Sequence, residues 1–114
     1  MEDCLFCKIA KGDIPSNKVY EDDIMLAFHD IAPEAPVHVL VIPKKHISSI
    51  SALEEDDAAI VGAIMLRIKA LADELGIAED GYRVVANTGK NGGQTVPHLH
   101  FHILGGRNLE WPPG

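Results

Sequence analysis

From position 98 to position 104 the sequence alternates histidine with apolar residues, reading His-Leu-His-Phe-His-Ile-Leu. This alternation has the two-residue period of a β-strand, which places the histidines on one face and the apolar side chains on the other. Neighbours on one face then lie roughly 6 to 7 Å apart. Histidine forms strands only moderately well and costs solvation when buried, so three in one strand weaken a fold that gains nothing from them. The run therefore predicts a strand whose histidine face carries chemistry.

The remaining sequence predicts one domain over residues 1–114 with an α+β fold. Strands are expected at 19–20, 24–28, 37–42, 82–87 and 98–104, a short helix at 4–11 ended by Gly12, and a long helix ended by Gly76. Ser51 and Glu54 form a capping-box pair before the long helix, in which apolar residues recur at helical spacing from Val61 to Leu75. Five short strands with one dominant helix between the third and fourth indicate a mainly antiparallel sheet with one long and one short helix.

Charge and composition exclude several classes of partner. The chain has 17 acidic and 10 basic residues and a net charge of -7, so we expect no attraction to nucleic acid or to an anionic membrane. The sequence has no run long enough to span a bilayer and no basic leader after Met1, which predicts a cytoplasmic protein. Because only 5% of residues are aromatic, aliphatic side chains must form the core, and added burial in a dimer is favoured.

Three interpretations of the histidine run are open: metal ligands, a nucleophile with helpers, or surface residues of no consequence. A single catalytic metal bound by all three would need a nearby carboxylate to orient the rings, and no Asp or Glu lies between Asp80 and Glu110. A neutral imidazole can attack phosphorus when its other nitrogen keeps a proton held by an acceptor. Flanking histidines can then hold phosphoryl oxygens or relay a proton. The pattern therefore favours nucleophilic catalysis without a catalytic metal.

A glycine-rich segment, Asn-Thr-Gly-Lys-Asn-Gly-Gly-Gln-Thr, occupies residues 87–95 just before the histidine run. Its glycines allow backbone N–H groups to converge on an anion, and Asn87, Gln94 and Thr95 offer side-chain donors. An ordinary hairpin loop has a similar composition, but the neighbouring histidines favour an anion site. His38 shares a strand face with apolar residues, a location more typical of a structural histidine.

Cys4 and Cys7, the only cysteines, have C-x-x-C spacing. In a reducing compartment this spacing points away from a structural disulfide and towards metal or redox chemistry. The two side chains could also pack as small hydrophobic groups in the first helix. A thiol–disulfide function is less favoured, because the βαβ pattern expected beside such a motif is missing from the sequence.

Residues 98–104 resemble the signature of the histidine-triad (HIT) superfamily, histidine–apolar–histidine–apolar–histidine–apolar–apolar, and the resemblance extends through almost the whole chain. Segments 27–30, 41–46, 105–107 and 111–114 resemble the histidine triad nucleotide-binding (Hint) branch. This resemblance implies a HIT-like fold whose sheets join across a homodimer. It also implies hydrolysis of purine nucleoside phosphoramidates, derivatives of AMP or GMP, through a nucleotidyl-histidine intermediate.

The resemblance assigns roles to individual residues. His100 is implied as the nucleophile, and His102 and His38 as the groups beside the phosphate. Asn87, Gly93 and Thr95 are implied as contacts to the phosphate or leaving group, with Thr95 standing where relatives often have serine.

The nucleoside is implied to bind through a carboxylate and an apolar slot. Asp30 resembles the residue that accepts both ribose hydroxyls, which suits an ionised carboxylate with two acceptor oxygens. Trp111 belongs to a tail that is implied to reach towards the partner subunit's active site. The slot for the base is implied to comprise Phe6, Ile9, Ile14, Phe28, Ile31 and Leu40.

Cys4 and Cys7 resemble those of a subset of the family that holds zinc, and the matching histidines are His46 and His98. Two thiolates and two imidazoles complete a tetrahedral zinc site and leave no open position, so this zinc is implied to be structural. Two other functions stay open for the chain as a whole. One is a nucleotide-binding adaptor with incidental turnover. The other is a dinucleoside polyphosphate hydrolase, although segments 105–107 and 111–114 favour the phosphoramidate branch.

Overall fold

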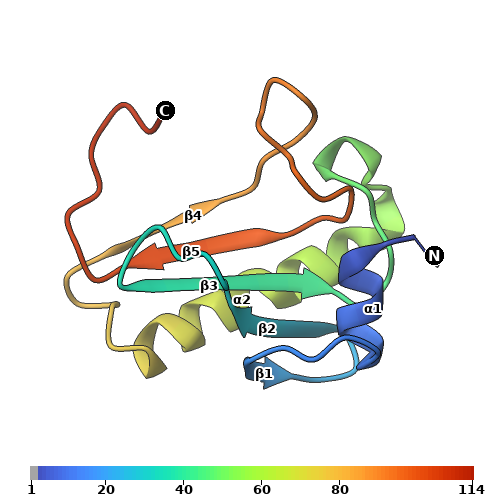
Figure 1. Ribbon diagram of the computed structural model, residues 1–114, viewed down its shortest axis with the longest axis horizontal. Coiled ribbons are helices and arrows are strands. Elements are labelled where there is room, and N and C mark those ends of the chain that lie inside the picture. Colours follow the sequence, from blue (N-terminus) through green and yellow to red (C-terminus); the bar gives the residue numbers. More distant parts are fainter. Residues whose placement is uncertain (1–2) are drawn as a thin grey trace.

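Five strands within residues 3–114 pair into one antiparallel sheet with the order β1-β2-β3-β5-β4 (Figure 1). The computed structural model describes residues 3–114. Its elements are α1 (Leu5–Lys11), β1 (Lys18–Glu21), β2 (Met25–His29), β3 (Val37–Pro43), η1 (Ile50–Ala52), η2 (Glu55–Asp57), α2 (Ala58–Glu74), β4 (Tyr82–Val85) and β5 (Phe101–Gly105). This is the α+β fold with a five-stranded antiparallel sheet, one long and one short helix, that the sequence predicts.

The two faces of the sheet carry different side chains because residues alternate along each strand. In the pairing of β3 with β5, Val41 lies opposite Phe101, and Leu40 lies opposite His102. Val41 and Phe101 belong to the cluster that packs on α2, whereas Leu40 belongs to the cluster on the other face. The register of these two strands therefore separates the main core from the histidine face.

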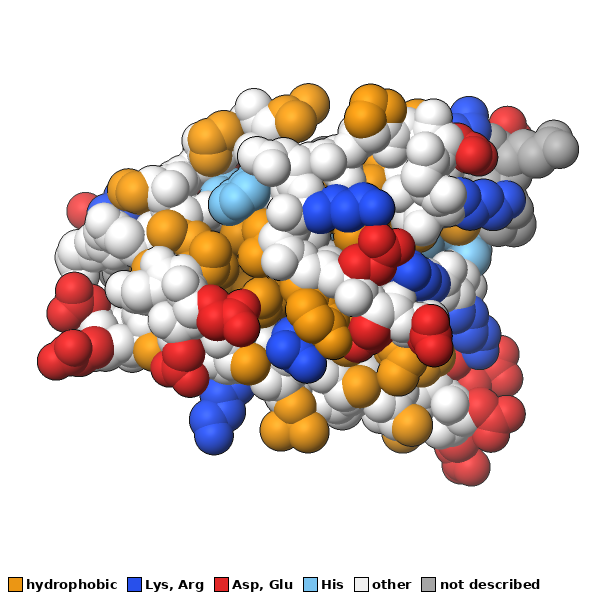
Figure 2. Space-filling view, turned by 90° about the horizontal axis from the view of Figure 1, so that it is seen from below, with side chains coloured by type: hydrophobic (Ala, Val, Ile, Leu, Met, Phe, Trp, Pro, Cys, Tyr) orange, Lys and Arg blue, Asp and Glu red, His pale blue; other side chains and the backbone are white. Residues whose placement is uncertain are grey.

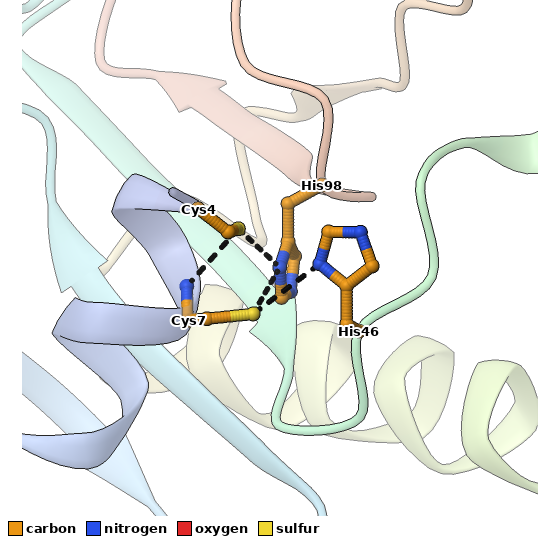
Figure 3. Close-up of side chains that lie close together, drawn as sticks. All are labelled: Cys4, Cys7, His46 and His98. Carbon is orange, nitrogen blue, oxygen red and sulfur yellow. Dashed lines mark hydrogen bonds between the residues drawn. The ribbon is translucent and has the colours of Figure 1, made fainter. Parts of the chain in front are cut away.

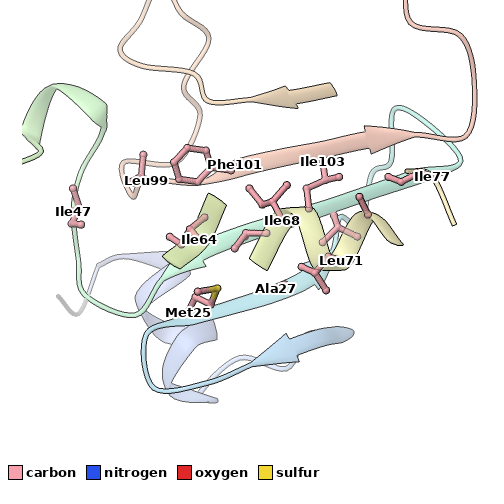
Figure 4. Close-up of a cluster of buried hydrophobic side chains, with 13 residues drawn as sticks. Met25, Ala27, Ile47, Ile64, Ile68, Leu71, Ile77, Leu99, Phe101 and Ile103 are labelled. Carbon is pink, nitrogen blue, oxygen red and sulfur yellow. The ribbon is translucent and has the colours of Figure 1, made fainter. Parts of the chain in front are cut away.

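Helix α2 covers the first face of the sheet and buries Ile64, Ile68 and Leu71 against it (Figure 4). Each such side chain contributes about 2 kcal/mol by leaving water. The spacing of these residues confirms the predicted amphipathic helix. The buried members of this core are Met25, Ala27, Val39, Val41, Ile47, Ile64, Ile68, Leu71, Ala72, Ile77, Leu99, Phe101 and Ile103.

Helix α1 packs on the opposite face, as its position in front of β2 and β3 in Figure 1 shows. The sulfur of its N-cap residue, Cys4, accepts a hydrogen bond from the Cys7 backbone N–H at 3.3 Å. Gly12 ends the helix with a φ of 87°, a conformation that glycine adopts without strain. The second cluster comprises Cys4, Phe6, Cys7, Ile9, Leu26, Phe28, Leu40 and Ile42.

The last strand is shorter than the sequence pattern predicts, because β5 begins at Phe101 and not at His98. Before this point the backbone bonds to a loop, as the Leu99 N–H donates to the carbonyl of Ile47 at 2.6 Å. Alternation nevertheless persists, since Leu99 remains in the α2 core. The predicted strand at 82–87 likewise ends early, at Val85.

The predicted capping box of Ser51 and Glu54 is wrong. Ser51 lies inside the short helix η1, and the capping box is formed by Glu54 and Asp57, directly before α2. The Asp57 carboxylate accepts the Glu54 backbone N–H at 3.0 Å and the Lys45 ammonium at 2.6 Å. This second bond ties the capping box to the segment after β3.

Within residues 3–114, no helix is both long and apolar enough to cross a membrane. On the face shown in Figure 2, Lys and Arg side chains are interspersed with Asp and Glu. That face thus presents mixed charge, and not the gathered basic patch that a nucleic-acid backbone would require.

We expect Asp57→Asn to lower Tm at neutral pH by a few degrees. The bonds from Lys45 and from the Glu54 backbone hold the pKa of Asp57 below its usual value near 3.8. This interaction therefore contributes in full above that value and is lost as the pH falls below it. Thermal unfolding of both proteins should show a Tm difference at pH 7 that shrinks below about pH 4. Asp56→Asn, the same change at an exposed neighbour, is the control and should have little effect; equal losses from the two variants would contradict the assignment.

Candidate functional site

Three histidines lie in a row on the histidine face of the sheet. His38 comes from β3, His102 from β5, and His100 from the segment just before β5. The Nε2 atom of His38 lies 2.8 Å from the Nδ1 atom of His102, and the rings of His100 and His102 have centroids 5.1 Å apart. The structure thus brings together the three histidines for which the family resemblance implies catalytic roles.

Hydrogen bonds fix which nitrogen of each neutral ring carries its proton. The backbone N–H of Glu34 donates to Nδ1 of His38 at 3.0 Å, so the His38 proton is on Nε2. That Nε2–H in turn donates to Nδ1 of His102. His102 therefore carries its own proton on Nε2, as a hydrogen-bond donor that is not used by His38.

His100 has the opposite tautomer. Its Nδ1–H donates to the backbone carbonyl of His98 at 2.7 Å, which leaves a lone pair on Nε2. The side chain is only 4% exposed, so few water molecules compete for this nitrogen. An unprotonated nitrogen whose partner nitrogen is held by a carbonyl can attack an electrophile without a separate base.

Burial keeps His102 neutral. Loss of solvation, followed by the neighbouring His100 and His38 rings, lowers the pKa of His102 from 6.5 to about 4. At neutral pH His102 is therefore uncharged, in agreement with the tautomers that the hydrogen bonds require.

A carboxylate does lie near the histidines, contrary to the expectation from residues 80–110. Asp30, just after β2, places Oδ2 at 3.4 Å from Nε2 of His38. Together with His102, these side chains form a group whose ligand atoms lie within 4.8 Å of one another. Nε2 of His38 and Nδ1 of His102 are already bonded to each other, however, so a cation here would have to break that bond.

The glycine-rich segment forms an ordered loop beside the histidines. The Gln94 side chain accepts the Gly89 N–H at 3.0 Å and donates to the Ser48 carbonyl at 2.6 Å. Gln94 is thus used to fix the loop and is not a free donor for an anion, which corrects one sequence expectation. Gly93 has a φ of 79°, a conformation that favours glycine, while Asn87 is half-buried and Thr95 is exposed.

Most residues of the predicted apolar slot lie together on the histidine face. Phe6, Ile9, Phe28 and Leu40 are buried in one cluster, and Ile14 packs at its border, half-buried. Ile31 differs, because its side chain is fully exposed after the end of β2.

The two cysteines and two further histidines form a second group at the start of α1 (Figure 3). Nδ1 of His98 lies 3.2 Å from the Cys4 sulfur and 3.5 Å from the Cys7 sulfur, and Nδ1 of His46 lies 3.2 Å from the Cys7 sulfur. All four ligand atoms are within 4.8 Å of one another. The structure thus gathers the four residues that the sequence assigns to zinc.

The chemistry of this cluster fits a divalent metal. Nε2–H of His98 donates to the Pro43 carbonyl at 2.9 Å, so the lone pair on Nδ1 points to the sulfurs. Such an outer hydrogen bond is typical of metal-binding histidines. Burial and the neighbouring Cys4 raise the pKa of Cys7, so a metal would have to displace the thiol proton. A Cys2His2 donor set suits tetrahedral zinc.

Trp111 lies outside the histidine face in this chain, and its side chain is 81% exposed. The Arg83 guanidinium of β4 lies 6.0 Å from its ring and donates to the Glu110 carbonyl at 3.0 Å. The tail is therefore tied to β4 while its largest apolar side chain remains uncovered.

Sequence reasoning missed two contacts that organise the site. The Glu34 bond to His38 comes from the backbone, for which side-chain identity gives no signal. The ring of Phe6 meets the ring of His100 edge-on, with centroids 5.0 Å apart. The C-x-x-C spacing could have indicated that Phe6 lies in the same helical turn as the cysteines, but not what it contacts.

Comparison with known proteins agrees with this fold. The HIT domain family model matches residues 11–109. An uncharacterized HIT-like protein of Synechococcus elongatus is 54% identical over 113 residues, which cover 99% of this chain and 98% of that protein. The crystal structure of a HIT family hydrolase from Legionella pneumophila has 53% identity and a TM-score of 0.97, over 98% of this chain and 100% of that one. A histidine triad nucleotide-binding protein from Candida albicans has 36% identity and a TM-score of 0.82, over 96% and 83%.

We expect the His102 ring to titrate near pH 4, because burial disfavours its charged form. The unfolded chain binds this proton below about 6.5, so the free energy of unfolding falls as the pH drops from 6.5 towards 4. Histidine NMR signals followed against pH give the midpoint directly. Asp30→Asn removes a carboxylate that raises the pKa of His102 and should move the midpoint lower still. A wild-type midpoint near 6.5 would contradict the neutral state of the buried His102 ring.

Proposed function

The chain belongs to the HIT family, and we propose on that basis that it is a nucleotidyl hydrolase or transferase of the Hint branch. Its substrates are phosphoramidates of AMP or GMP, and the bond that it cleaves joins the α-phosphorus to nitrogen. The observation that carries the proposal is the tautomer of His100, whose Nδ1–H is held by the His98 carbonyl while Nε2 keeps a lone pair.

In the first step, Nε2 of His100 attacks the α-phosphorus, and a nitrogen–phosphorus bond forms to the ring as the bond to the leaving amine breaks. The leaving nitrogen takes up a proton, for which the Thr95 hydroxyl is the candidate donor. The imidazolium of the nucleotidyl-histidine keeps its bond from Nδ1–H to the His98 carbonyl. In the second step, water attacks the phosphorus and the bond from phosphorus to Nε2 breaks, which releases the nucleoside monophosphate and restores the neutral ring. The proton that the water loses replaces the one that Thr95 gave to the leaving amine.

His102 acts on the phosphoryl oxygens, and His38 supports it from the neighbouring strand. His102 carries its proton on Nε2, which supports a role as a neutral donor to the charge that develops on phosphorus. His38 fixes this tautomer of His102, because its Nε2–H donates to Nδ1 of His102. Asn87 and Gly93 complete the phosphate contacts.

The nucleoside binds on the face formed by β2, β3 and α1. The Asp30 carboxylate accepts the two ribose hydroxyls. Its Oδ2 lies 3.4 Å from Nε2 of His38, and its Oδ1, which accepts the Ala32 N–H at 2.8 Å, keeps a second lone pair. Phe6, Phe28 and Leu40 supply the apolar walls for a purine, a role supported by their burial in one cluster.

Two further features complete the proposal. A homodimer places the exposed Trp111 of each tail near the partner subunit's active site, where it affects the choice of leaving group. One structural zinc per chain is held by Cys4, Cys7, His46 and His98 and ties α1 to the end of β3 and to the histidine segment.

We expect His100→Gly to lower phosphoramidate hydrolysis by at least about 1,000-fold while nucleotide still binds, because the slot remains and only the covalent route is lost. The experiment combines steady-state rates with single-turnover trapping of a labelled nucleotidyl group on the protein. The matched control is His29→Gly, which removes an exposed histidine at the end of β2.

Near-normal turnover in correctly folded His100→Gly would refute the assignment of His100 as the nucleophile. If the wild type binds nucleotide but His100 never acquires label, the result would instead favour a nucleotide-binding adaptor. Preferential turnover of diadenosine polyphosphates over adenosine phosphoramidates would favour the polyphosphate hydrolase.

We expect about one zinc per chain by elemental analysis of protein purified without chelators. Replacing Cys4→Ser and Cys7→Ser together should lower Tm by roughly 10 °C or more, since metal binding energy at a closed site appears as folding stability. Wild-type protein treated with a strong chelator serves as the control, and its Tm should be close to that of the double variant. A metal-free wild type with unchanged Tm on addition of zinc would show that the cysteines serve only in packing.

A further inference from the structure

We propose that the first turn of α1 positions the nucleophile, with Phe6 as the positioning residue. This inference rests on the proposed function, because it takes His100 as the attacking group. It goes beyond a role of Phe6 as a wall for the purine and beyond a zinc cluster that serves stability alone.

Phe6 lies directly against the reacting ring. Its centroid is 5.0 Å from that of His100, with an interplanar angle of 86°, so the two rings meet edge to face. Phe28 holds Phe6 from another side at 5.8 Å and 74°. With Phe6 only 5% exposed, this stack has little room to rearrange, and the His100 ring is restrained on the side that faces α1.

The same turn restrains His100 through its other nitrogen. Cys4 and Cys7 flank Phe6 in the sequence, and both sulfurs contact Nδ1 of His98. The carbonyl of that same His98 accepts the Nδ1–H of His100 at 2.7 Å. One helical turn therefore fixes the nucleophile twice, through a ring contact and through a backbone carbonyl that the cysteine cluster holds in place.

This double restraint matters for attack at phosphorus. A surface imidazole changes rotamer freely, whereas displacement needs Nε2 in line with the bond that breaks, and small errors of placement slow such steps strongly. A wall for the base would affect nucleotide affinity, while a positioning residue affects the rate of the chemical step. The two roles of Phe6 are therefore separable by experiment.

The first test compares Phe6→Leu, which keeps apolar volume but removes the ring, with Ile64→Val on the opposite face of the sheet. We expect Phe6→Leu to slow formation of the nucleotidyl-His100 intermediate roughly tenfold in single turnover at saturating substrate, where weaker nucleotide binding alone would not lower the rate. Ile64→Val should lower Tm but leave the single-turnover rate at the wild-type value.

Weaker AMP binding at an unchanged single-turnover rate would overturn the proposal and leave Phe6 as a wall of the slot. Equal slowing in Phe6→Leu and Ile64→Val would also overturn it, because the effect would then follow stability alone.

The second test needs no turnover. NMR of the histidine rings should show His100 protonated on Nδ1 in the zinc-loaded wild type, with its signals shifted and broadened in Phe6→Leu and on removal of zinc by a chelator. The signals of His29, on the α2 face of the sheet, should stay unchanged. His100 signals that respond to neither change would overturn the positioning role. A wild type that shows these responses but never acquires label on His100 would instead refute the proposed function.

Discussion

The register between β3 and β5 is the constraint on which both the core and the candidate site depend. With Leu40 opposite His102, apolar side chains of both strands face α2 and the imidazoles face α1. A slip of one residue would exchange the two sets and bury histidines against aliphatic side chains. The aliphatic core and the histidine row therefore enforce the same pairing, because each is stable on one face only.

Neutral hydrogen bonding, and not charge, organises the histidine row. The backbone N–H of Glu34 fixes the tautomer of His38, and His38 in turn fixes the tautomer of His102. The carbonyl of His98 fixes the tautomer of His100. Burial lowers the pKa of His102 and so opposes protonation that would break this chain. The arrangement explains how imidazoles can stand close together at neutral pH without the repulsion that charged rings would suffer.

The strand and helix patterns of the sequence were sufficient for the fold, because both depend on local periods of two and 3.6 residues. The same period placed the three histidines of the run, and the family resemblance supplied His38 and the metal ligands. Three features needed contacts between distant segments. Asp57 completes the capping box before α2 and binds Lys45, Asp30 reaches the histidines from the segment after β2, and Gln94 is tied to Ser48. Nothing in the spacing of these residues indicates those contacts, so prediction from sequence ended there.

The separation of the two faces has an evolutionary consequence. Side chains that meet α2 carry most of the buried aliphatic core, while those on the other face surround the histidines. Substitutions in the exposed loop and tail leave both buried clusters untouched and cost little folding stability. Such a scaffold can diverge in ligand preference through its exposed segments while purifying selection maintains the buried residues on both faces.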